Sequence, residues 1–374
     1  MKLFLVVNVD WFFLSHRLPI ALEAKRRGYD VTVVAINTGR AEEIKNYGLH
    51  FIPMPTSRRG LNVFKELPII KLLYKLYKTH QPDVVHHVAL KPVMYGSLAA
   101  RFFKNIRFVN AISGMGYIFS NSEKDTGLRK LVKQIFKIAF NNKRLHFIFQ
   151  NEDDKALILN LNVVHPKQCH IIQGSGIDLK EFLYTPEPQT DVIKIIYTGR
   201  LLWDKGIGEL TEAAHTLKKK YGDKIQIILA GGIDPENRAF ITEKQILEWQ
   251  EKGIIKWVGF QSDIYKLLTD AHIIVLPSYR EGLPKSLIEA CAVGRPIVTT
   301  DVPGCRDVVE NGVNGFLVPF KNSAALANAL EKLVDDKELR VAMGKMGREI
   351  AEQKFSIESV LDKTFAIYEQ HIDQ

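Results

Sequence analysis

Short apolar runs that alternate with helical patterns restrict the fold of this chain more than any other sequence feature. Most runs are rich in Val and Ile and carry apolar residues at consecutive positions. Such strands, separated by helices, form parallel sheets with both faces covered. We therefore predict an α/β protein with two doubly wound, Rossmann-like domains, one for each half of the chain. The runs are Leu3–Val7, Asp30–Ile36, His50–Pro53, Asp83–Val88, Arg107–Ile112, His146–Gln150 and His170–Gln173 in the first half, and Ile193–Thr198, Ile225–Leu229, Ile255–Val258, Ile273–Leu276, Pro296–Thr300 and Gly315–Val318 in the second.

The length of the chain also requires two domains. Its 374 residues exceed the roughly 100–200 residues of one ordinary domain. Residues 174–188 are rich in turn formers and are typical of a linker. We expect a first domain over residues 1–180 and a second over 181–356, with a C-terminal helix of about 357–374 packing back on the first. Ligands of doubly wound sheets bind beyond the carboxyl ends of the strands, so the two domains would face each other across a cleft.

The cysteine content and the hydropathy of the chain indicate the cellular compartment in which the protein works. Cys169, Cys291 and Cys305 are scattered and odd in number, which excludes a full disulfide framework and fits a reducing cytosol. No apolar run approaches the roughly 18 residues that a spanning helix needs. We therefore expect a soluble, cytosolic protein.

Charge is distributed unevenly along the chain. Residues 1–187 contain 27 Lys and Arg against 15 Asp and Glu, a net charge of +12, whereas residues 188–374 carry −3. A basic half indicates a polyanionic partner: nucleic acid, an anionic membrane or a phosphorylated substrate. Two basic segments, Lys65–Lys78 and Leu128–Phe140, carry apolar residues at helical spacing. Each either lies in a lipid interface or packs its apolar face on its own sheet.

The loop after Ile193–Thr198 contains residues that suit a diphosphate. Gly199 allows a close backbone approach, while Arg200 and Lys205 place two cations just before a helix. A guanidinium, an ammonium and helix amides together can bind two phosphates. The loop lacks the Gly-x4-Gly-Lys-[Ser/Thr] pattern of a Walker loop.

Two carboxylates follow the strand Ile273–Leu276. Glu281 and Gly282 precede a helix, and Glu289 lies about two turns further on, on roughly the same helical face. Carboxylates that look into one cleft can accept hydrogen bonds from sugar hydroxyls. The helix around Glu289 is nearly all apolar, and a buried carboxylate requires partners.

Glycine turns follow other strands, as at Gly231 and at Gly259-Phe260. None of them completes Gly-x-Gly-x-x-Gly, which disfavours a nicotinamide dehydrogenase.

Taken together, these motifs resemble retaining glycosyltransferase family 4, of GT-B architecture. The motifs are Gly199-Arg200 with Lys205, Glu281-Gly282-Leu283-Pro284 with Glu289, Asp301-Val302-Pro303-Gly304, and Asn311-Gly312-Val313-Asn314-Gly315-Phe316. The likeness covers essentially the whole chain and is strongest over residues 195–320. It implies a UDP-sugar donor, bound mainly by the second domain, and a reaction that needs neither a metal nor a cofactor. The chain contains no Asp-x-Asp triplet, which agrees.

The resemblance also implies roles for individual residues. Arg200 and Lys205 hold the donor diphosphate, Glu281 contacts the transferred sugar, and Glu289 takes the ribose hydroxyls. The expected donor-binding residues are Gly199, Arg200, Lys205, Gly231, Gly259, Phe260, Glu281, Gly282, Leu283, Pro284 and Glu289.

The first domain is then expected to hold the acceptor. Residues that follow its strands are the candidates, namely Ser15, His16, Arg17, Lys91 and Gly114. The family often has His-x-His after strand four, whereas this chain has adjacent His86 and His87, so which of the two is catalytic stays open.

We expect a bacterial transferase that acts on the inner face of the plasma membrane as a peripheral protein. It would move an N-acetylhexosamine or hexose from a UDP-sugar to a polyprenyl-diphosphate-linked glycan in capsule or lipopolysaccharide biosynthesis. Two alternatives stay open: a nucleotide-sugar 2-epimerase of the same architecture, and a non-catalytic basic protein that binds nucleic acid. The second-domain motifs disfavour both, and the chain lacks every standard nucleic-acid-binding motif.

Overall fold

The chain forms two compact units in the computed structural model. The structure describes residues 1–55, 63–115 and 127–370, with the side chains of all of these except 63–66 and 127–133. Unit 1 comprises Met1–Ser175 together with Ser359–Gln374, and unit 2 comprises Gly176–Glu358. Among the described residues, no helix is long and apolar enough to cross a membrane.

Unit 1 is built on a seven-stranded parallel sheet, in the order β3-β2-β1-β4-β5-β6-β7. The seven strands predicted for the first half are confirmed, with boundaries within two residues. Their β-branched and aromatic runs stay apolar on both faces because helices cover both. The strands are β1 (Lys2–Val9), β2 (Asp30–Ile36), β3 (His50–Pro53), β4 (Val84–Val88), β5 (Arg107–Ile112), β6 (Leu145–Phe149) and β7 (Cys169–Ile171).

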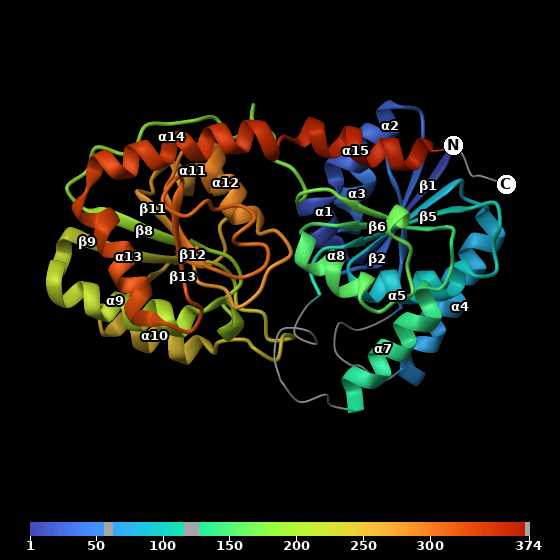
Figure 1. Cartoon of the computed structure of the whole chain (residues 1–374), viewed down its shortest axis with the longest axis horizontal. Coiled ribbons are helices and arrows are strands. Elements are labelled where there is room, and N and C mark those ends of the chain that lie inside the picture. The colour runs from blue at the N-terminus through green and yellow to red at the C-terminus, as the bar shows by residue number, and fades with distance from the viewer. Residues whose placement is uncertain (56–62, 116–126, 371–374) are drawn as a thin grey trace. The chain divides into compact units, whose positions relative to one another are not determined.

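Helices of unit 1 form a layer on each side of this sheet (Figure 1). One layer packs on strand residues such as Phe4, Val85 and Phe108, the other on Leu5, Val33 and Val109. The first layer contains α4 (Val63–His80), α5 (Leu90–Ala100), α7 (Gly127–Phe140) and α8 (Glu152–Leu159). The second contains α1 (Asp10–His16), α2 (Leu18–Arg26), α3 (Ala41–Asn46) and α15 (Ile357–Glu369).

The last helix, α15, completes the second layer of unit 1. Its Tyr368 hydroxyl lies 2.5 Å from Nδ1 of His86, and the Tyr368 carbonyl accepts a hydrogen bond from Arg107. Arg27 of unit 1 stacks its guanidinium 4.1 Å above the ring of Phe365. Polar and apolar contacts of this kind tie residues near both ends of the chain to one sheet.

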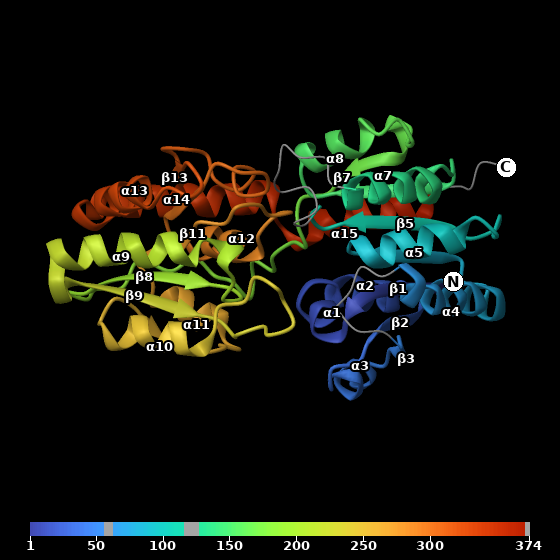
Figure 2. The same ribbon diagram turned by 90° about the horizontal axis from the view of Figure 1, so that it is seen from below.

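Unit 2 contains a six-stranded parallel sheet, in the order β10-β9-β8-β11-β12-β13. The six predicted strands are confirmed. Figure 2 shows α9 on one side of β8 and β9, with α10 and α11 on the other. The strands are β8 (Ile193–Thr198), β9 (Ile225–Ala230), β10 (Lys256–Trp257), β11 (Ile273–Leu276), β12 (Ile297–Thr300) and β13 (Gly315–Val318). The helices are α9 (Ile207–Tyr221), α10 (Glu243–Glu251), α11 (Ile264–Thr269), α12 (Lys285–Val293), α13 (Ser323–Asp335) and α14 (Lys337–Lys354).

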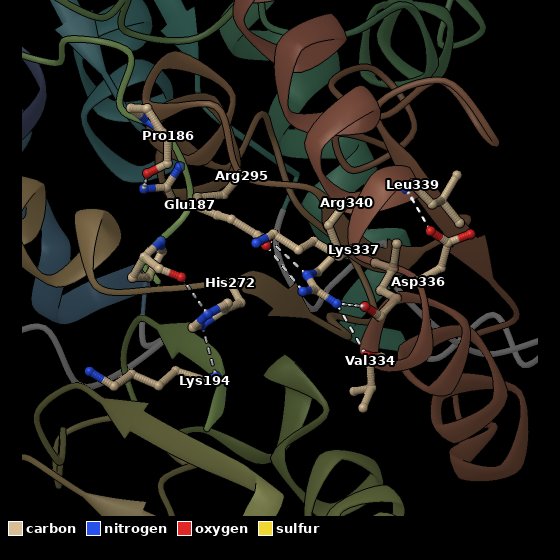
Figure 3. Close-up of polar contacts among 12 residues, drawn as sticks. Pro186, Glu187, Lys194, His272, Arg295, Val334, Asp336, Lys337, Leu339 and Arg340 are labelled. Carbon is tan, nitrogen blue, oxygen red and sulfur yellow. Dashed lines mark hydrogen bonds and ion pairs between the residues drawn. The ribbon is translucent and has the colours of Figure 1, made fainter. Parts of the chain in front are cut away.

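A segment at the start of unit 2, residues 184–189, is fastened to the body of the unit by buried polar groups (Figure 3). Arg340 forms a two-pronged ion pair with Glu187, with N–O distances of 2.9 and 3.1 Å. His272 accepts a hydrogen bond from the Lys194 amide and contacts the Pro188 carbonyl through its other ring nitrogen. We call residues 184–189 the strap.

Arg295 is the most buried of the groups that hold the strap, with no exposed surface. Its guanidinium donates hydrogen bonds to oxygen atoms of the strap and of the helix ends around it. These acceptors are the carbonyls of Thr185, Pro186, Leu268, Thr269, Val293 and Gly294 and the Thr185 hydroxyl. Backbone dipoles thereby replace the water that this cation would otherwise bind.

Acid is expected to destabilise unit 1 through His87. Nδ1 of this buried histidine lies 2.7 Å from Oδ1 of Asn110, and Nε2 lies 2.7 Å from the Tyr77 hydroxyl. Burial lowers the pKa of His87 to about 4. In the unfolded chain the His87 ring is protonated near pH 6.5, but in the folded chain only near pH 4. The neutral ring therefore contributes its full stabilisation of the fold above pH 6.5, and this contribution is lost as the pH falls from 6.5 towards 4. From pH 7.5 to 5 this residue alone should lower the free energy of unfolding by about 2 kcal/mol.

The measurement is urea denaturation at both pH values, for the wild type and for His87→Gln. The variant should have a pH dependence that is smaller by about 2 kcal/mol. His80→Gln is the matched control, because His80 lies exposed at the end of α4. An unchanged pH dependence in His87→Gln would contradict the assignment.

Candidate active site

Residues predicted to bind the donor follow neighbouring strands of unit 2. Gly199, Arg200 and Lys205 follow β8, and Glu281 follows β11. Strands β8 and β11 are hydrogen-bonded neighbours, so their carboxyl ends lie side by side at one edge of the sheet. The parallel topology alone brings these four residues together.

Lys205 and Glu281 form the centre of this group. The Lys205 ammonium pairs with Oε1 of Glu281, and the same oxygen accepts a hydrogen bond of 2.6 Å from the Ser278 hydroxyl. Both side chains are largely buried, with 20% of Lys205 and 12% of Glu281 exposed. An ion pair shielded in this way is much stronger than one at the surface.

Close backbone packing fixes the loops that carry this pair. A Cβ atom at Gly206 would collide with the Pro277 carbonyl, and one at Gly231 would collide with the Gly199 carbonyl. The Tyr279 amide also donates a hydrogen bond of 2.9 Å to the Asp204 carbonyl. The loops after β8, β9 and β11 are therefore locked to one another, which is what a preorganised charged site requires.

Arg200 is held by a residue that the sequence analysis missed. Its Nη1 lies 2.9 Å from Oδ2 of Asp234, in the loop after β9, and 41% of the Arg200 side chain remains exposed. The Tyr197 hydroxyl donates a 2.7 Å hydrogen bond to the Arg200 carbonyl. Asp234 follows a strand, like the residues that were predicted, so the same rule could have found it.

Asp204 adds a second carboxyl group beside Lys205. Burial raises its pKa, and its Oδ1 atom is buried without a hydrogen-bond partner among the described residues. Burial thus makes this carboxylate costlier to ionise than a free aspartate.

Glu289 lies in α12 and is buried, with 7% of its surface exposed. Burial raises its pKa, and its ion pair with Lys285, one turn earlier in the helix, is long at 3.5 Å. The helix that carries it starts directly after Leu283 and Pro284, which are also buried. A carboxyl group in this setting is suited to accept hydrogen bonds from hydroxyl groups.

Gly231, Gly259 and Phe260 lie at the ends of β9 and β10. The Gly231 amide donates a hydrogen bond of 2.8 Å to the Gly259 carbonyl, which joins the two loops. Phe260 extends from this point and has 76% of its surface exposed. These residues thus follow β9, which neighbours β8, and β10, which neighbours β9, at the edge of the sheet that carries Arg200.

In unit 1 the residues predicted to bind the acceptor follow β1, β4 and β5, which are neighbours in the sheet. Ser15 and His16 lie in α1, where the His16 ring stacks on Phe12 at 4.3 Å and Nδ1 lies 2.6 Å from the Ser15 hydroxyl. Lys91 lies in the first turn of α5, and Gly114 follows β5 with a φ of +130°. The topology thereby gathers these residues at one edge.

Arg17 differs from this group because it is buried, with 4% of its surface exposed. Its Nη1 donates a hydrogen bond to the His16 carbonyl, and burial lowers its pKa to about 10. A guanidinium inside the core cannot reach an acceptor at the surface. The structure therefore argues against direct acceptor binding by Arg17.

His86 and His87 were predicted as catalytic candidates, and both lie in the interior of β4 with 1% or less of their surface exposed. His87 contacts Tyr77 and Asn110, and His86 contacts Tyr368. Consecutive residues of a strand point to opposite faces, and here both faces are covered by helices. Neither ring is exposed in this structure, so a catalytic role for either one stays a prediction.

The arrangement in unit 2 can bind an anion with several hydroxyl groups. Arg200 and Lys205 supply positive charge and N–H donors, while Glu281 and Glu289 supply acceptors. Each cation already faces a carboxylate, so an incoming diphosphate would compete with Asp234 and Glu281 for the same donors.

Two family models match the chain, one for each unit. Residues 2–151 match glycosyl transferase 4-like domains, and residues 185–350 match glycosyl transferases group 1.

Curated relatives match over nearly the whole length. An N,N'-diacetylbacillosaminyl-diphospho-undecaprenol alpha-1,3-N-acetylgalactosaminyltransferase of Campylobacter jejuni is 31% identical, over 89% of this chain and 91% of that one. The capsular polysaccharide biosynthesis glycosyltransferase CapM of Staphylococcus aureus is 25% identical, over 92% and 90%. An Escherichia coli UDP-Gal:alpha-D-GlcNAc-diphosphoundecaprenol alpha-1,3-galactosyltransferase is also 25% identical, over 91% and 89%.

Solved structures share the fold. Sucrose-phosphate synthase from Thermosynechococcus elongatus superposes with a TM-score of 0.83 at 21% identity, over 99% of both chains. Anabaena HepE in complex with UDP superposes with a TM-score of 0.77 at 18% identity, over 98% of this chain and 99% of that one. These likenesses confirm the GT-B fold. Both family models and the relative at 31% identity agree on one conclusion: the chain belongs to the glycosyltransferases, with a family 4-like first domain and a group 1 second domain.

Proposed function

We propose that this glycosyltransferase moves an N-acetylhexosamine or hexose from a UDP-sugar to a glycan on a polyprenyl diphosphate, with retention of the anomeric configuration. The reaction would need no metal ion or cofactor and would take place at the inner face of the plasma membrane. The observation that carries the proposal is the cluster of Arg200, Lys205 and Glu281 at adjoining strand ends. The Campylobacter and Escherichia relatives are named for lipid-linked diphosphate acceptors of this kind.

The proposed chemistry follows from the charges. Cleavage of the glycosyl–phosphate bond leaves a nucleoside diphosphate, whose growing negative charge Arg200 and Lys205 stabilise. Glu281 would contact the sugar, and Glu289 would accept hydrogen bonds from the ribose. The sugar gains oxocarbenium-like character, and the acceptor hydroxyl attacks from the face that the phosphate leaves. The departing phosphate takes the acceptor proton, so the step requires no protein nucleophile.

Transfer is favoured over the two alternatives. The named relatives and both family models are transferases, whereas an epimerase would release free hexosamine and UDP without an acceptor. An anionic membrane and a lipid-linked diphosphate would account for the basic charge of residues 1–187 without a nucleic acid partner.

The test is incubation of the full chain with a panel of UDP- and GDP-sugars, with and without polyprenyl-diphosphate-linked saccharides, in the presence and absence of EDTA. We expect a UDP-sugar to be consumed with transfer only when the lipid-linked acceptor is present, equally with EDTA. NMR of the product should show the anomeric configuration of the donor. Acceptor-independent release of hexosamine, or an inverted product, would contradict the proposal.

A further inference from the structure

Nearly all of the net positive charge of the first half comes from one segment. Residues 61–150 contain 15 Lys and Arg but 4 Asp and Glu, so they hold +11 of the +12 charge of residues 1–187. This segment supplies α4, α5 and α7, and all three pack on the same side of the sheet. The described lysines of α4 and α7 thereby lie in one helix layer of unit 1, which is on the lower side of that unit in Figure 1.

The same face carries exposed apolar side chains. Apart from Met1, the three most exposed large apolar residues described in unit 1 are Phe102, Ile138 and Leu67, at 71%, 56% and 52%. Phe102 follows α5, Ile138 lies in the last turn of α7, and Leu67 lies in α4. Two helices of this layer, α4 and α7, thus each carry one of these residues, and the third residue lies just after α5.

Contacts connect these positions into one surface. The Phe102 ring lies edge-on to Tyr74 of α4, with the ring centroids 5.4 Å apart. Arg101, next to Phe102, donates a hydrogen bond of 2.6 Å to the Ile138 carbonyl of α7. Exposed lysines lie on the same helices or just after them, namely Lys71, Lys75, Lys78, Lys104 and Lys137. We call Leu67, Tyr74, Phe102, Ile138 and these lysines the basic apolar face.

The apolar stripes of the two predicted amphipathic segments do not form this face. Ile69, Leu73 and Leu76 of α4 are buried against the sheet, as are Phe136 and Phe140 of α7. For these residues, packing on the sheet of unit 1 is confirmed. Among the described side chains of α4 and α7, the large apolar residues that remain exposed are Leu67 and Ile138.

We propose that the basic apolar face lies on an anionic lipid bilayer, with Phe102 and Ile138 entering the headgroup region and the lysines lying against anionic headgroups. An aromatic ring and an aliphatic side chain among cations suit the interface between headgroups and acyl chains. Lysine stems can lie along the apolar surface while the ammonium groups stay among phosphates. The identification of a membrane as the partner rests on the proposed function, because a lipid-linked acceptor places the reaction there.

The experiment is flotation of the full chain, without any sugar substrate, on vesicles of phosphatidylcholine with about 30% phosphatidylglycerol. The wild type should bind, and binding should weaken as salt is raised, because headgroup attraction is screened. Phe102→Ser and Ile138→Ser should each weaken partitioning about tenfold, and Lys71→Ser with Lys75→Ser should weaken it by a similar factor. Phe102→Trp should retain binding and acquire a blue-shifted emission with anionic vesicles.

Leu22→Ser is the matched control, because Leu22 is an exposed leucine on the opposite helix layer of unit 1. It should bind like the wild type. No wild-type binding, or equal binding by Phe102→Ser and Leu22→Ser, would overturn the inference. A stable dimer in size-exclusion chromatography that Phe102→Ser dissociates would also overturn it, in favour of a second copy on this face.

A water-soluble acceptor with a short prenyl chain separates this inference from the proposed function. Phe102→Ser should transfer sugar to it at the wild-type rate. If the chain binds vesicles but transfers sugar to no lipid-linked saccharide, the proposed function is contradicted and the inference about the basic apolar face is not. If the chain transfers sugar but does not bind vesicles, the inference about the face is contradicted and the proposed function is not.

Discussion

Replacement of Lys205 by alanine is expected to lower kcat at least about a hundredfold, because the ammonium group is a preorganised charge beside the leaving diphosphate. Glu281→Gln keeps the shape of its side chain and an acceptor for Ser278 but removes the negative charge. We expect this substitution to lower kcat by a similar factor. The measurement is steady-state transfer from the donor that the panel identifies, with circular dichroism and thermal unfolding to confirm that each variant is folded.

The double variant of Lys205 and Glu281 is informative because the two residues act as a pair. The fold reduction of kcat in the double variant should be much smaller than the product of the fold reductions in the two single variants. Lys244→Ala is the control, since Lys244 is exposed in the first turn of α10. Turnover at the wild-type rate in Lys205→Ala or Glu281→Gln would refute the roles assigned to them.

Arg295→Met is expected to destabilise unit 2 by about 3 kcal/mol or more. The methionine fills much of the space, but it leaves the buried oxygens of the strap and the surrounding helix ends without their donor. Burial also lowers the pKa of Arg295 to about 10, so the cation persists at neutral pH and is held by carbonyl dipoles. Arg295→Lys should lose most of the same stability, because a single ammonium cannot reach all of these acceptors.

Urea denaturation followed by tryptophan fluorescence measures this effect, because Trp203, Trp249 and Trp257 all lie in unit 2. Arg238→Met serves as the control, as Arg238 is an exposed arginine of the same unit. A loss below about 1 kcal/mol in Arg295→Met would show that the strap does not depend on this guanidinium.

The strands and the grouping of Arg200, Lys205 and Glu281 could be predicted from the sequence for one physical reason. Buried parallel strands need unbroken apolar runs, and polar residues that directly follow such runs must lie at the same edge of a sheet. The partners of these residues could not be predicted in this way. The pairing of Arg200 with Asp234 and the contact of Ser278 with Glu281 depend on how the loops after β8, β9 and β11 fold against one another.

The two histidines of β4 show that residue type alone does not predict whether a side chain is exposed. His86 and His87 lie inside an apolar run, and a central strand of a doubly wound sheet is covered on both faces, so the pattern itself indicated burial. Arg17 gave no such signal. It lies between α1 and α2 in a short polar stretch, and only the packing of these helices and α15 shows that its guanidinium is enclosed.

The position of α15 has a consequence for how the protein is made on the ribosome. The chain leaves unit 1 after Ser175, builds the whole of unit 2, and returns at Ser359. His86 and Arg107 find their partner Tyr368 only in these final residues. Unit 1 emerges first from the ribosome but stays incomplete until α15 has left the exit tunnel. Its folding is therefore begun first and finished last, and a stop codon ahead of α15 yields a product whose first sheet lacks part of its helix cover.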